Sequence, residues 1–254
     1  MKKLSFIILL PFLIFACGGS DENVREESVE SRDFSPASIQ KLKIDTENGN
    51  IQAIAKAGDS INITLTKWAT GSDSIEAKKN IDDIEVSINE DTGSQILDID
   101  IDVPDNTTAD YGCEVSAEIP ASMEMELESL NGAITIVDTE GKAKLKTLNG
   151  RIAVANHRGD LDGETSNGGI DADVILPDDG ECILRTSNGS IVLSIPGSAS
   201  AEIEASTLNG RIEIDHPGVL IDSMENNEFR GEIGGGEGYI KLEARNGNIT
   251  IERR

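Results

Sequence analysis

The stretch T-L-N-G-R-I-A-V at Thr147–Val154 decides the fold, because the chain contains closely similar eight-residue stretches seven times. Five consecutive copies have Asn-Gly pairs spaced 18, 18, 21 and 21 residues apart, and two outlying copies lie toward the two ends. A repeat of this length is typical of stacked β-solenoids. The asparagines of the seven copies are Asn48, Asn131, Asn149, Asn167, Asn188, Asn209 and Asn246.

Aligning the copies on their asparagine gives columns of one chemical kind. Isoleucine stands three residues after every asparagine, and a small residue, most often threonine, stands two residues before it. Mostly apolar residues fill the columns five after, four before and six before the asparagine. Apolar residues therefore alternate with period two, which predicts a strand with one buried face on each side of Asn-Gly.

The Asn-Gly pair is compatible with two all-β architectures. In an antiparallel β-hairpin meander, it would form two-residue turns between neighbouring strands of one sheet. In a single-stranded parallel β-helix-like solenoid, it would form corners, with like residues stacked in successive turns. We favour the solenoid, because stacking requires the same residue type at the same place in each turn. The glycine is expected to provide the positive φ that such a bend usually needs.

The first sixteen residues read as a targeting segment, in which Lys2 and Lys3 precede an apolar run too short for an ordinary spanning helix. The run ends I-F-A-C, which looks like a bacterial lipobox with Cys17 as the lipidated residue. We predict a lipoprotein signal peptide over residues 1–16 and membrane attachment, at the outer membrane if the cell is Gram-negative. A plain signal peptide with an incidental cysteine is the alternative. Residues 17–36 are acidic and aperiodic, which predicts a flexible tether.

Residues 37–254 are predicted to form one β-solenoid domain. Its first half, to about residue 120, has alternating segments without the Asn-Gly signature. We interpret these segments as turns with degenerate corners, and a separate sandwich-like domain is the alternative. The segment Trp68–Asn80 is expected to be helical and to cap or cross the first turns. The copy at Asn246 is expected to close the array at its C-terminal end.

Charge limits the possible partners. A net charge of −25 argues against binding nucleic acid or anionic lipid by electrostatics, and cationic peptides or divalent cations suit it better. Asp98, Asp100 and Asp102 share one strand face but lack the ligand spacing of a calcium motif, so we interpret them as an exposed face. Neither His157 nor His216 has a cysteine or histidine at metal-ligand spacing.

No catalytic motif is visible in the chain, which lacks G-x-S-x-G and a phosphate loop. Asp171, Asp173, Arg185 and Arg211 are residue types that β-helix enzymes use on polysaccharides, but an acidic strand surface yields such pairs by chance. We therefore predict no catalytic residue, no metal site and no cofactor. The asparagine column is expected to be a structural corner ladder, with a ligand-binding role as the alternative.

Two cysteines remain after Cys17. Cys113 and Cys182 are 69 residues apart in the sequence, which is about three turns. Strands stacked at about 4.8 Å would separate them by roughly 14 Å, whereas a disulfide needs Cα atoms within about 7 Å. We therefore expect no bridge between them.

Three sequence features occur together: the T-x-N-G-x-I repeat, the passage V-S-A-E-I-P-A-S-M-E-M-E-L-E-S-L-N-G at Val115–Gly132, and a terminal G-G-G-x-G-x-I-x-L-x-x-x-N-G-x-I. Together they resemble the DUF4097 family of adhesin-like β-strand-repeat proteins, which is related to the head-GIN domain. The resemblance covers most of residues 37–254. It implies a β-helix-like fold, an envelope or surface location and an adhesive or scaffolding role, and it supplies no catalytic residues.

These observations predict a lipid-anchored cell-envelope β-repeat protein that is not an enzyme. Its expected role is an adhesin-like binding or scaffolding surface for an unknown protein or polysaccharide ligand. One alternative is an envelope-stress protein that captures cationic peptides. Another is a carbohydrate-active β-helix enzyme.

Overall fold

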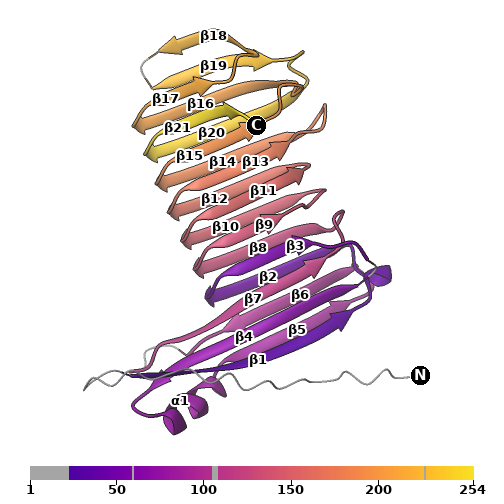
Figure 1. Cartoon of the computed structure of the whole chain (residues 1–254), viewed down its shortest axis with the longest axis vertical. Coiled ribbons are helices and arrows are strands. Elements are labelled where there is room, and N and C mark those ends of the chain that lie inside the picture. Colours follow the sequence, from indigo (N-terminus) through magenta and orange to yellow (C-terminus); the bar gives the residue numbers. More distant parts are fainter. Residues whose placement is uncertain (1–22, 59, 105–107, 226) are drawn as a thin grey trace.

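The computed structural model describes residues 23–58, 60–104, 108–225 and 227–254. Two long β-sheets lie face to face along the array (Figure 1). The strands that precede Asn-Gly lie in an eleven-stranded sheet, which we call the first-arm sheet. The strands that follow Asn-Gly lie in a ten-stranded second-arm sheet. The predicted signal peptide and Cys17 lie outside the described residues.

Each sheet has its own order of strands in space. The first-arm sheet contains, from one edge to the other, β18 (Val219–Glu225), β19 (Glu228–Ile233), β16 (Ala201–Asn209), β20 (Gly238–Asn246), β14 (Glu181–Asn188), β12 (Leu161–Asn167), β10 (Ala143–Asn149), β8 (Glu124–Asn131), β2 (Lys41–Asn48), β6 (Ile96–Asp102) and β5 (Glu85–Asp91). The second-arm sheet contains, in the same way, β1 (Val24–Phe34), β4 (Ile61–Gly71), β7 (Tyr111–Ile119), β3 (Ile51–Ala55), β9 (Ile134–Val137), β11 (Ile152–Arg158), β13 (Ile170–Ile175), β15 (Ile191–Ile195), β21 (Ile249–Arg253) and β17 (Ile212–Asp215).

Each repeat contributes one strand to each sheet, and neighbouring repeats pair in parallel. Asn149 pairs with Asn167 in the first-arm sheet, and Ile152 pairs with Ile170 in the second-arm sheet. This register stacks every column of the repeat on itself, as predicted for a solenoid with Asn-Gly corners. The hairpin meander is wrong, because the two arms that flank each Asn-Gly pair belong to different sheets.

The apolar columns fill the space between the two sheets. The isoleucine three residues after each asparagine is buried in all seven copies, with 0 to 7% of its surface exposed. Stacked sheets lie about 10 Å apart, which suits layers of aliphatic side chains. This packing is consistent with an aromatic content of only 3%.

The order of the repeats along the array differs from their order in the chain. The last copy lies inside the array, because β20 pairs with both β14 and β16, and β21 pairs with both β15 and β17. The prediction that the copy at Asn246 closes the array is therefore wrong, and β17 and β18 form this end. Since all copies share the same columns, the place between β14 and β16 fits the last copy as well as any other. The chain reaches it through the β18–β19 hairpin and a loop in which Gly234 and Gly236 have φ of 65° and 70°.

The N-terminal half contains one degenerate turn, in which β6 pairs in parallel with β2 and β7 with β3. The prediction of a run of such turns is wrong for the other strands, β4 and β5. The first repeat stacks directly on the second, with Asn48 opposite Asn131 and Ile51 opposite Ile134. The residues between these copies extend both sheets: β7 and β4 follow β3, and β6 and β5 follow β2. β4 pairs with β7 and β5 with β6 in antiparallel fashion, which no repeat spacing predicts. These strands form no separate domain, because both sheets continue through them.

Residues 24–34 form β1, so the predicted flexible tether is wrong for this stretch. The strand pairs antiparallel with β4 over its whole length, from Val24 opposite Gly71 to Phe34 opposite Ile61. Backbone hydrogen bonds hold this pairing and need no apolar side-chain pattern. Charged side chains are also typical of the exposed edge strand of a sheet. A short 3₁₀ helix, Pro36–Ser38, follows β1.

The expected helix is present as α1 (Ser74–Ile81), whereas Trp68 lies in β4. The Asp73 carboxylate caps the helix by accepting hydrogen bonds from the backbone N–H groups of Ile75 and Glu76. Buried Ala77 and Ile81 pack the helix against the sheet at the end of the array opposite β18 (Figure 1). No helix in the described ranges is long and apolar enough to span a membrane.

Candidate binding surface

The repeat asparagines form one continuous hydrogen-bonded ladder along the corners. At each step, the amide nitrogen of one asparagine donates to the amide oxygen of its neighbour over 2.8 or 2.9 Å. The ladder passes in spatial order through Asn48, Asn131, Asn149, Asn167, Asn188, Asn246 and Asn209. These side chains are therefore committed to one another and not to an outside ligand, except at the two ends.

A second ladder runs beside the first. In five copies, the hydroxyl group two residues before the asparagine donates to the carbonyl of the corner glycine in the adjacent turn, over 2.8 to 3.0 Å. Ala244 has no hydroxyl, so the Gly189 carbonyl lacks this donor. The Thr46 hydroxyl is buried and has no hydrogen-bond partner in the described chain.

The corner glycines are needed for a different reason than predicted. None of the seven is among the described residues with positive φ, so the expectation of a left-handed bend is wrong. A Cβ atom at any of them would lie 1.8 to 2.0 Å from a carbonyl oxygen of the adjacent turn. In six copies that oxygen belongs to the neighbouring corner glycine, and at Gly49 it belongs to Cys113. Close stacking of the corners, and not the bend itself, excludes a side chain.

Two buried thiols and the buried His157 are held in unreactive forms. Cys113 and Cys182 are free and buried, and burial raises the pKa of each thiol to about 12. Neither thiol therefore provides a thiolate near neutral pH. In His157, Nδ1 bonds with the Thr139 hydroxyl at 2.9 Å and Nε2 donates to the Asp160 carbonyl at 3.2 Å. Burial lowers the pKa of His157, which favours the neutral ring.

The residues that we considered for a polysaccharide-acting enzyme do not come together. Asp171 and Asp173 lie on the outer face of the second-arm sheet, where they pair with Arg151 at 2.6 Å and Arg254 at 3.3 Å. Arg185 lies on the first-arm sheet. Within the described ranges, no group of three or more His, Cys, Asp or Glu side chains is arranged to hold a metal ion.

The outer face of the first-arm sheet carries ion pairs between neighbouring turns. Glu126 lies between Lys41 at 2.6 Å and Lys144 at 2.9 Å. The hydrogen bonds from these two lysines lower the pKa of Glu126 to about 2, so this carboxylate stays ionised. Charges of both signs therefore alternate across the face, although the chain as a whole is strongly acidic.

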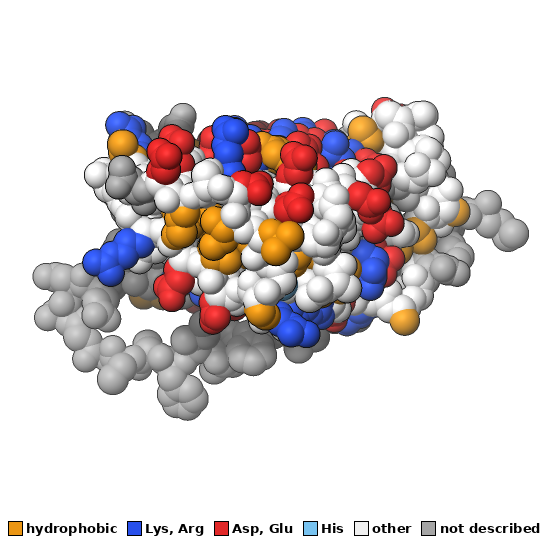
Figure 2. All heavy atoms as spheres, turned by 90° about the horizontal axis from the view of Figure 1, so that it is seen from above, with side chains coloured by type: hydrophobic (Ala, Val, Ile, Leu, Met, Phe, Trp, Pro, Cys, Tyr) orange, Lys and Arg blue, Asp and Glu red, His pale blue; other side chains and the backbone are white. Residues whose placement is uncertain are grey.

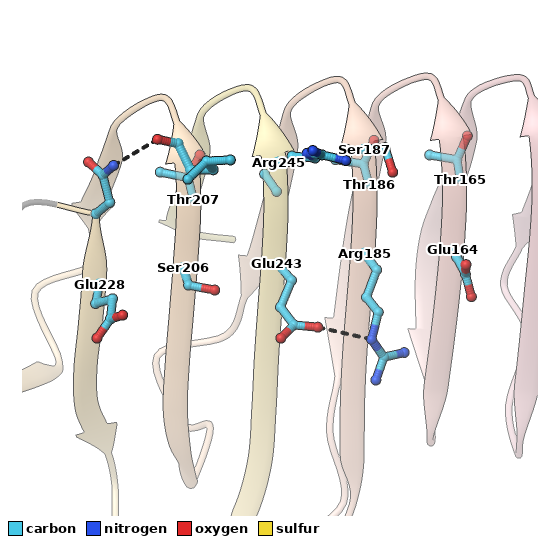
Figure 3. A pocket seen from close by; sticks show the side chains of 13 residues that line it. Glu164, Thr165, Arg185, Thr186, Ser187, Ser206, Thr207, Glu228, Glu243 and Arg245 are labelled. Carbon is cyan, nitrogen blue, oxygen red and sulfur yellow. Dashed lines mark hydrogen bonds and ion pairs between the residues drawn. The ribbon is translucent and has the colours of Figure 1, made fainter.

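A groove of about 550 Å³ crosses this face near the Asn-Gly corners, and we call it the corner groove (Figure 3). It extends over β12, β14, β20, β16 and β19. Arg185 projects into it, with Nε 3.1 Å from Glu243 (Figure 3). The Nη1 atom of Arg185 lies 3.2 Å from Asp162. Lys241 donates to Glu243 at 2.8 Å and holds the pKa of that carboxyl below its usual range. Ser206 follows in the adjacent strand, and its short side chain leaves the surface hollow there.

The remaining lining of the corner groove contains both polar and apolar side chains. Asn227 donates to the Leu208 carbonyl at 2.9 Å, and the Leu208 side chain is 60% exposed. No lining hydroxyl among the described residues is hydrogen-bonded to a histidine or a carboxylate that could act as a base. The groove therefore has groups for ion pairing and hydrogen bonding to an extended ligand, but no nucleophile with an adjacent base.

The Toastrack DUF4097 family model matches residues 105–252, which is more than half of the chain. The chain belongs to the DUF4097 family. The part matched by the Toastrack model includes every repeat except the one at Asn48, and therefore the whole corner groove. No curated protein matches the sequence.

One solved structure shares the fold of this chain. This structure, described as a "putative cell adhesion protein" from Clostridium sporogenes, aligns with 90% of this chain and 100% of its own, with a TM-score of 0.56 and 13% identity. Another, described as a "putative adhesin" from Bacteroides fragilis, covers 89% of this chain and 97% of its own, with a TM-score of 0.34 and 8% identity. The first of these shows that the DUF4097 chain shares its architecture with a solved protein.

Sequence reasoning missed the corner groove. Arg185 and Glu243 both stand three residues before their asparagines, so the repeat already placed them in one column. Their contact depends on the last copy lying beside the copy at Asn188, and this order is not visible in the repeat. The shared column could be read from the repeat, but the sequence does not show which residue of that column lies beside Arg185.

Proposed function

We propose that this Toastrack protein is tethered to the cell envelope by a lipid on Cys17 and presents its outer faces as an adhesin-like binding surface. The lipobox sequence I-F-A-C supports the anchor, and with it an outer-membrane location. The adhesive role is supported by the fold that the chain shares with the Clostridium sporogenes structure. The ligand in this proposal is a protein or a polysaccharide.

One observation carries the proposal. Every column that the seven copies share faces the core or the corner, whereas the outward columns differ from copy to copy. Three residues before the asparagine, for example, the stack presents Asp45, Glu128, Lys146, Glu164, Arg185, Glu243 and Ser206. The repeat is thus a scaffold, and the outward positions are free to determine what the protein binds.

A Cys17→Ser variant tests the anchor. The wild-type chain should fractionate with membranes, and the variant should appear in the soluble fraction. The same distribution for both chains would contradict lipid anchoring.

Cells that display the chain should also adhere to protein- or polysaccharide-coated surfaces. A double variant, Arg185→Ala with Glu243→Ala, tests whether the corner groove takes part. Lys146→Ala, in the same outward column but outside the groove, is the matched control.

A second candidate is capture of cationic peptides at the end of the array formed by β17 and β18. Figure 2 shows this end, with hydrophobic side chains across its middle and both acidic and basic side chains around them. Leu220, Ile221 and Met224 on β18 are 61, 56 and 51% exposed. The acidic residues of β17 and β18 are Glu213, Asp215, Asp222 and Glu225, and the two strands contain no lysine or arginine. An amphipathic cation would find both apolar and charge complementarity here.

This candidate is tested by titrating a cationic amphipathic peptide at low and at high ionic strength. Binding should weaken as salt is added, because exposed charges are screened. Met224→Lys should weaken binding relative to the wild-type chain, because it places a positive charge among the exposed apolar residues of β18. Ile75→Lys on α1 is the control, since Ile75 is an exposed apolar residue at the opposite end. Absence of binding at low ionic strength would rule out peptide capture.

A further inference from the structure

A second hollow, of about 670 Å³, lies at the other end of the asparagine ladder. Strands β1, β4, β7, β2 and β8 contribute to it, so it lies where the first repeat meets the non-repeat strands. Its polar lining includes Arg25, Asn48, Asn50, Asp110 and Glu114. We call it the Trp68 hollow, after the single tryptophan of the chain, which forms part of its wall.

The tryptophan is held in place by a glycine and an arginine. Gly112 lies opposite Trp68 on the adjacent strand, and a Cβ atom there would come within 2.6 Å of two ring carbons. The guanidinium carbon of Arg25 lies 4.1 Å from the ring centroid, and the same guanidinium pairs with Glu27 at 2.9 Å. A cation over an indole face is attracted by the ring quadrupole. Arg25 is therefore positioned before any ligand arrives, and its remaining N–H groups can donate hydrogen bonds to a ligand in the hollow.

The corner ladders end at this hollow. All the remaining asparagines of the ladder donate an amide hydrogen to a neighbour. The Asn48 amide nitrogen, in contrast, has no acceptor in the described chain. The Asn50 side chain accepts a hydrogen bond from the Ala133 backbone N–H, which leaves its own NH₂ group free. The reason is topological: the next strand, β7, brings Gly112 and Cys113 to this level instead of another Asn-Gly corner. Two amide donors are consequently left at the edge of the hollow.

Acceptors lie on the same wall. Asp110 and Glu114 are exposed, and neither carboxylate has an ion-pair partner among the described residues. Val103, Pro104 and Tyr111 add apolar surface. The two carboxylates would repel a phosphate or another simple anion, and Arg25 would repel a polyamine. A molecule with many hydroxyl groups can both donate and accept, and its C–H faces suit the apolar part of the wall.

We propose that the Trp68 hollow is a saccharide-binding site for a neutral oligosaccharide. The inference rests on the proposed binding function and names its ligand class. In the complex, the sugar hydroxyls accept from Asn48, Asn50 and Arg25 and donate to the carboxylate of Glu114. The site is separate from the corner groove, because the two share no lining residue.

The test uses the full chain and an array of neutral hexose and N-acetylhexosamine oligosaccharides, with acidic glycans and inorganic phosphate as comparison ligands. At least one neutral oligosaccharide should bind, and titration with it should change the fluorescence of Trp68, because the chain has no other tryptophan. Glu114→Gln should weaken binding at least tenfold. Glu118→Gln, on the same face of β7 but outside the hollow, should leave the affinity unchanged. A Trp68→Phe chain should lose affinity with unchanged circular dichroism.

The proposal is overturned if no neutral oligosaccharide binds, if only acidic glycans or phosphate bind, or if Glu114→Gln binds as well as Glu118→Gln. Adhesion of cells that display the full chain separates this result from the proposed function. Adhesion without saccharide binding overturns the Trp68 hollow and leaves the adhesive surface in place. Saccharide binding by the purified chain without adhesion of the cells overturns the adhesive role and retains the site.

Discussion

Replacing the corner glycine Gly150 by alanine should destabilise the array strongly. The new Cβ atom would lie 1.9 Å from the Gly132 carbonyl oxygen, whereas real Cβ contacts essentially never fall below 3.0 Å. The two turns must therefore separate by about 1 Å or more at this corner. Such a movement stretches the Asn149–Asn131 side-chain bond of 2.8 Å and the Thr147–Gly132 bond of 2.9 Å.

The size of the effect follows from these contacts. Overpacking costs about 1–3 kcal/mol, and two weakened hydrogen bonds cost about 0.5–1.5 kcal/mol each, so we expect a loss of about 2–6 kcal/mol. Urea unfolding, followed by circular dichroism, measures this loss. Gly235→Ala is the control, because a Cβ atom there meets only the Ser200 hydroxyl at 3.6 Å and the Glu237 Cγ at 4.0 Å, both ordinary contacts.

A second variant distinguishes close stacking from a backbone requirement. If Gly150 were needed for a positive φ, asparagine would be tolerated there much better than alanine. Because the obstacle is the neighbouring carbonyl, Gly150→Asn should be at least as destabilising as Gly150→Ala. A stability of Gly150→Ala within about 0.5 kcal/mol of wild type, the usual range for innocuous substitutions, would refute the reasoning.

The remaining predictions concern one missing hydroxyl, one ion-pair network and the buried thiols. Ala244→Thr should restore the donor to the Gly189 carbonyl and raise the unfolding free energy by about 0.5–1.5 kcal/mol, and an unchanged urea midpoint would contradict this. The pKa of Glu126 is lowered to about 2 by Lys41 and Lys144, so its contribution is present above the unfolded pKa of about 4.3 and lost as the pH falls toward 2. Glu126→Gln should therefore reduce stability at pH 7 and flatten its fall in acid, as measured by urea unfolding at several pH values. The two buried thiols, with pKa raised to about 12, should resist alkylation at pH 8 in the native chain and react in urea, and rapid native labelling would argue against their burial.

The repeat columns predict the solenoid because each column has a single physical role. An isoleucine in every copy at the same distance from Asn-Gly requires one buried position per turn, and the structure contains that position in all seven turns. The sequence does not predict which turns are neighbours. The copy at Asn246 has the same columns as the copy at Asn209, so nothing in either arm specifies which of them lies beside Asn188.

The N-terminal strands and the Trp68 hollow were hidden for a different reason. The β1 sequence is mostly charged and has no period-two apolar face, and its pairing with β4 depends on backbone groups that every residue has. The hollow gathers Arg25, Asn48, Trp68 and Glu114, which are far apart in the chain. Antiparallel pairing between non-repeat strands brings them together, and no periodic pattern encodes that pairing.

The internal place of the last repeat has a consequence for synthesis. Residues 201–233 leave the ribosome before residues 238–253, yet β20 and β21 lie between them and the older part of the array. Until the last two strands emerge, β14 has no partner on the side where β20 will lie. The residue columns of β14 match those of β16. A chain in synthesis can therefore first pair β16 with β14, and folding then ends when β20 displaces it. The array of this chain is therefore completed from within, when β20 and β21 take their places between strands that were made earlier.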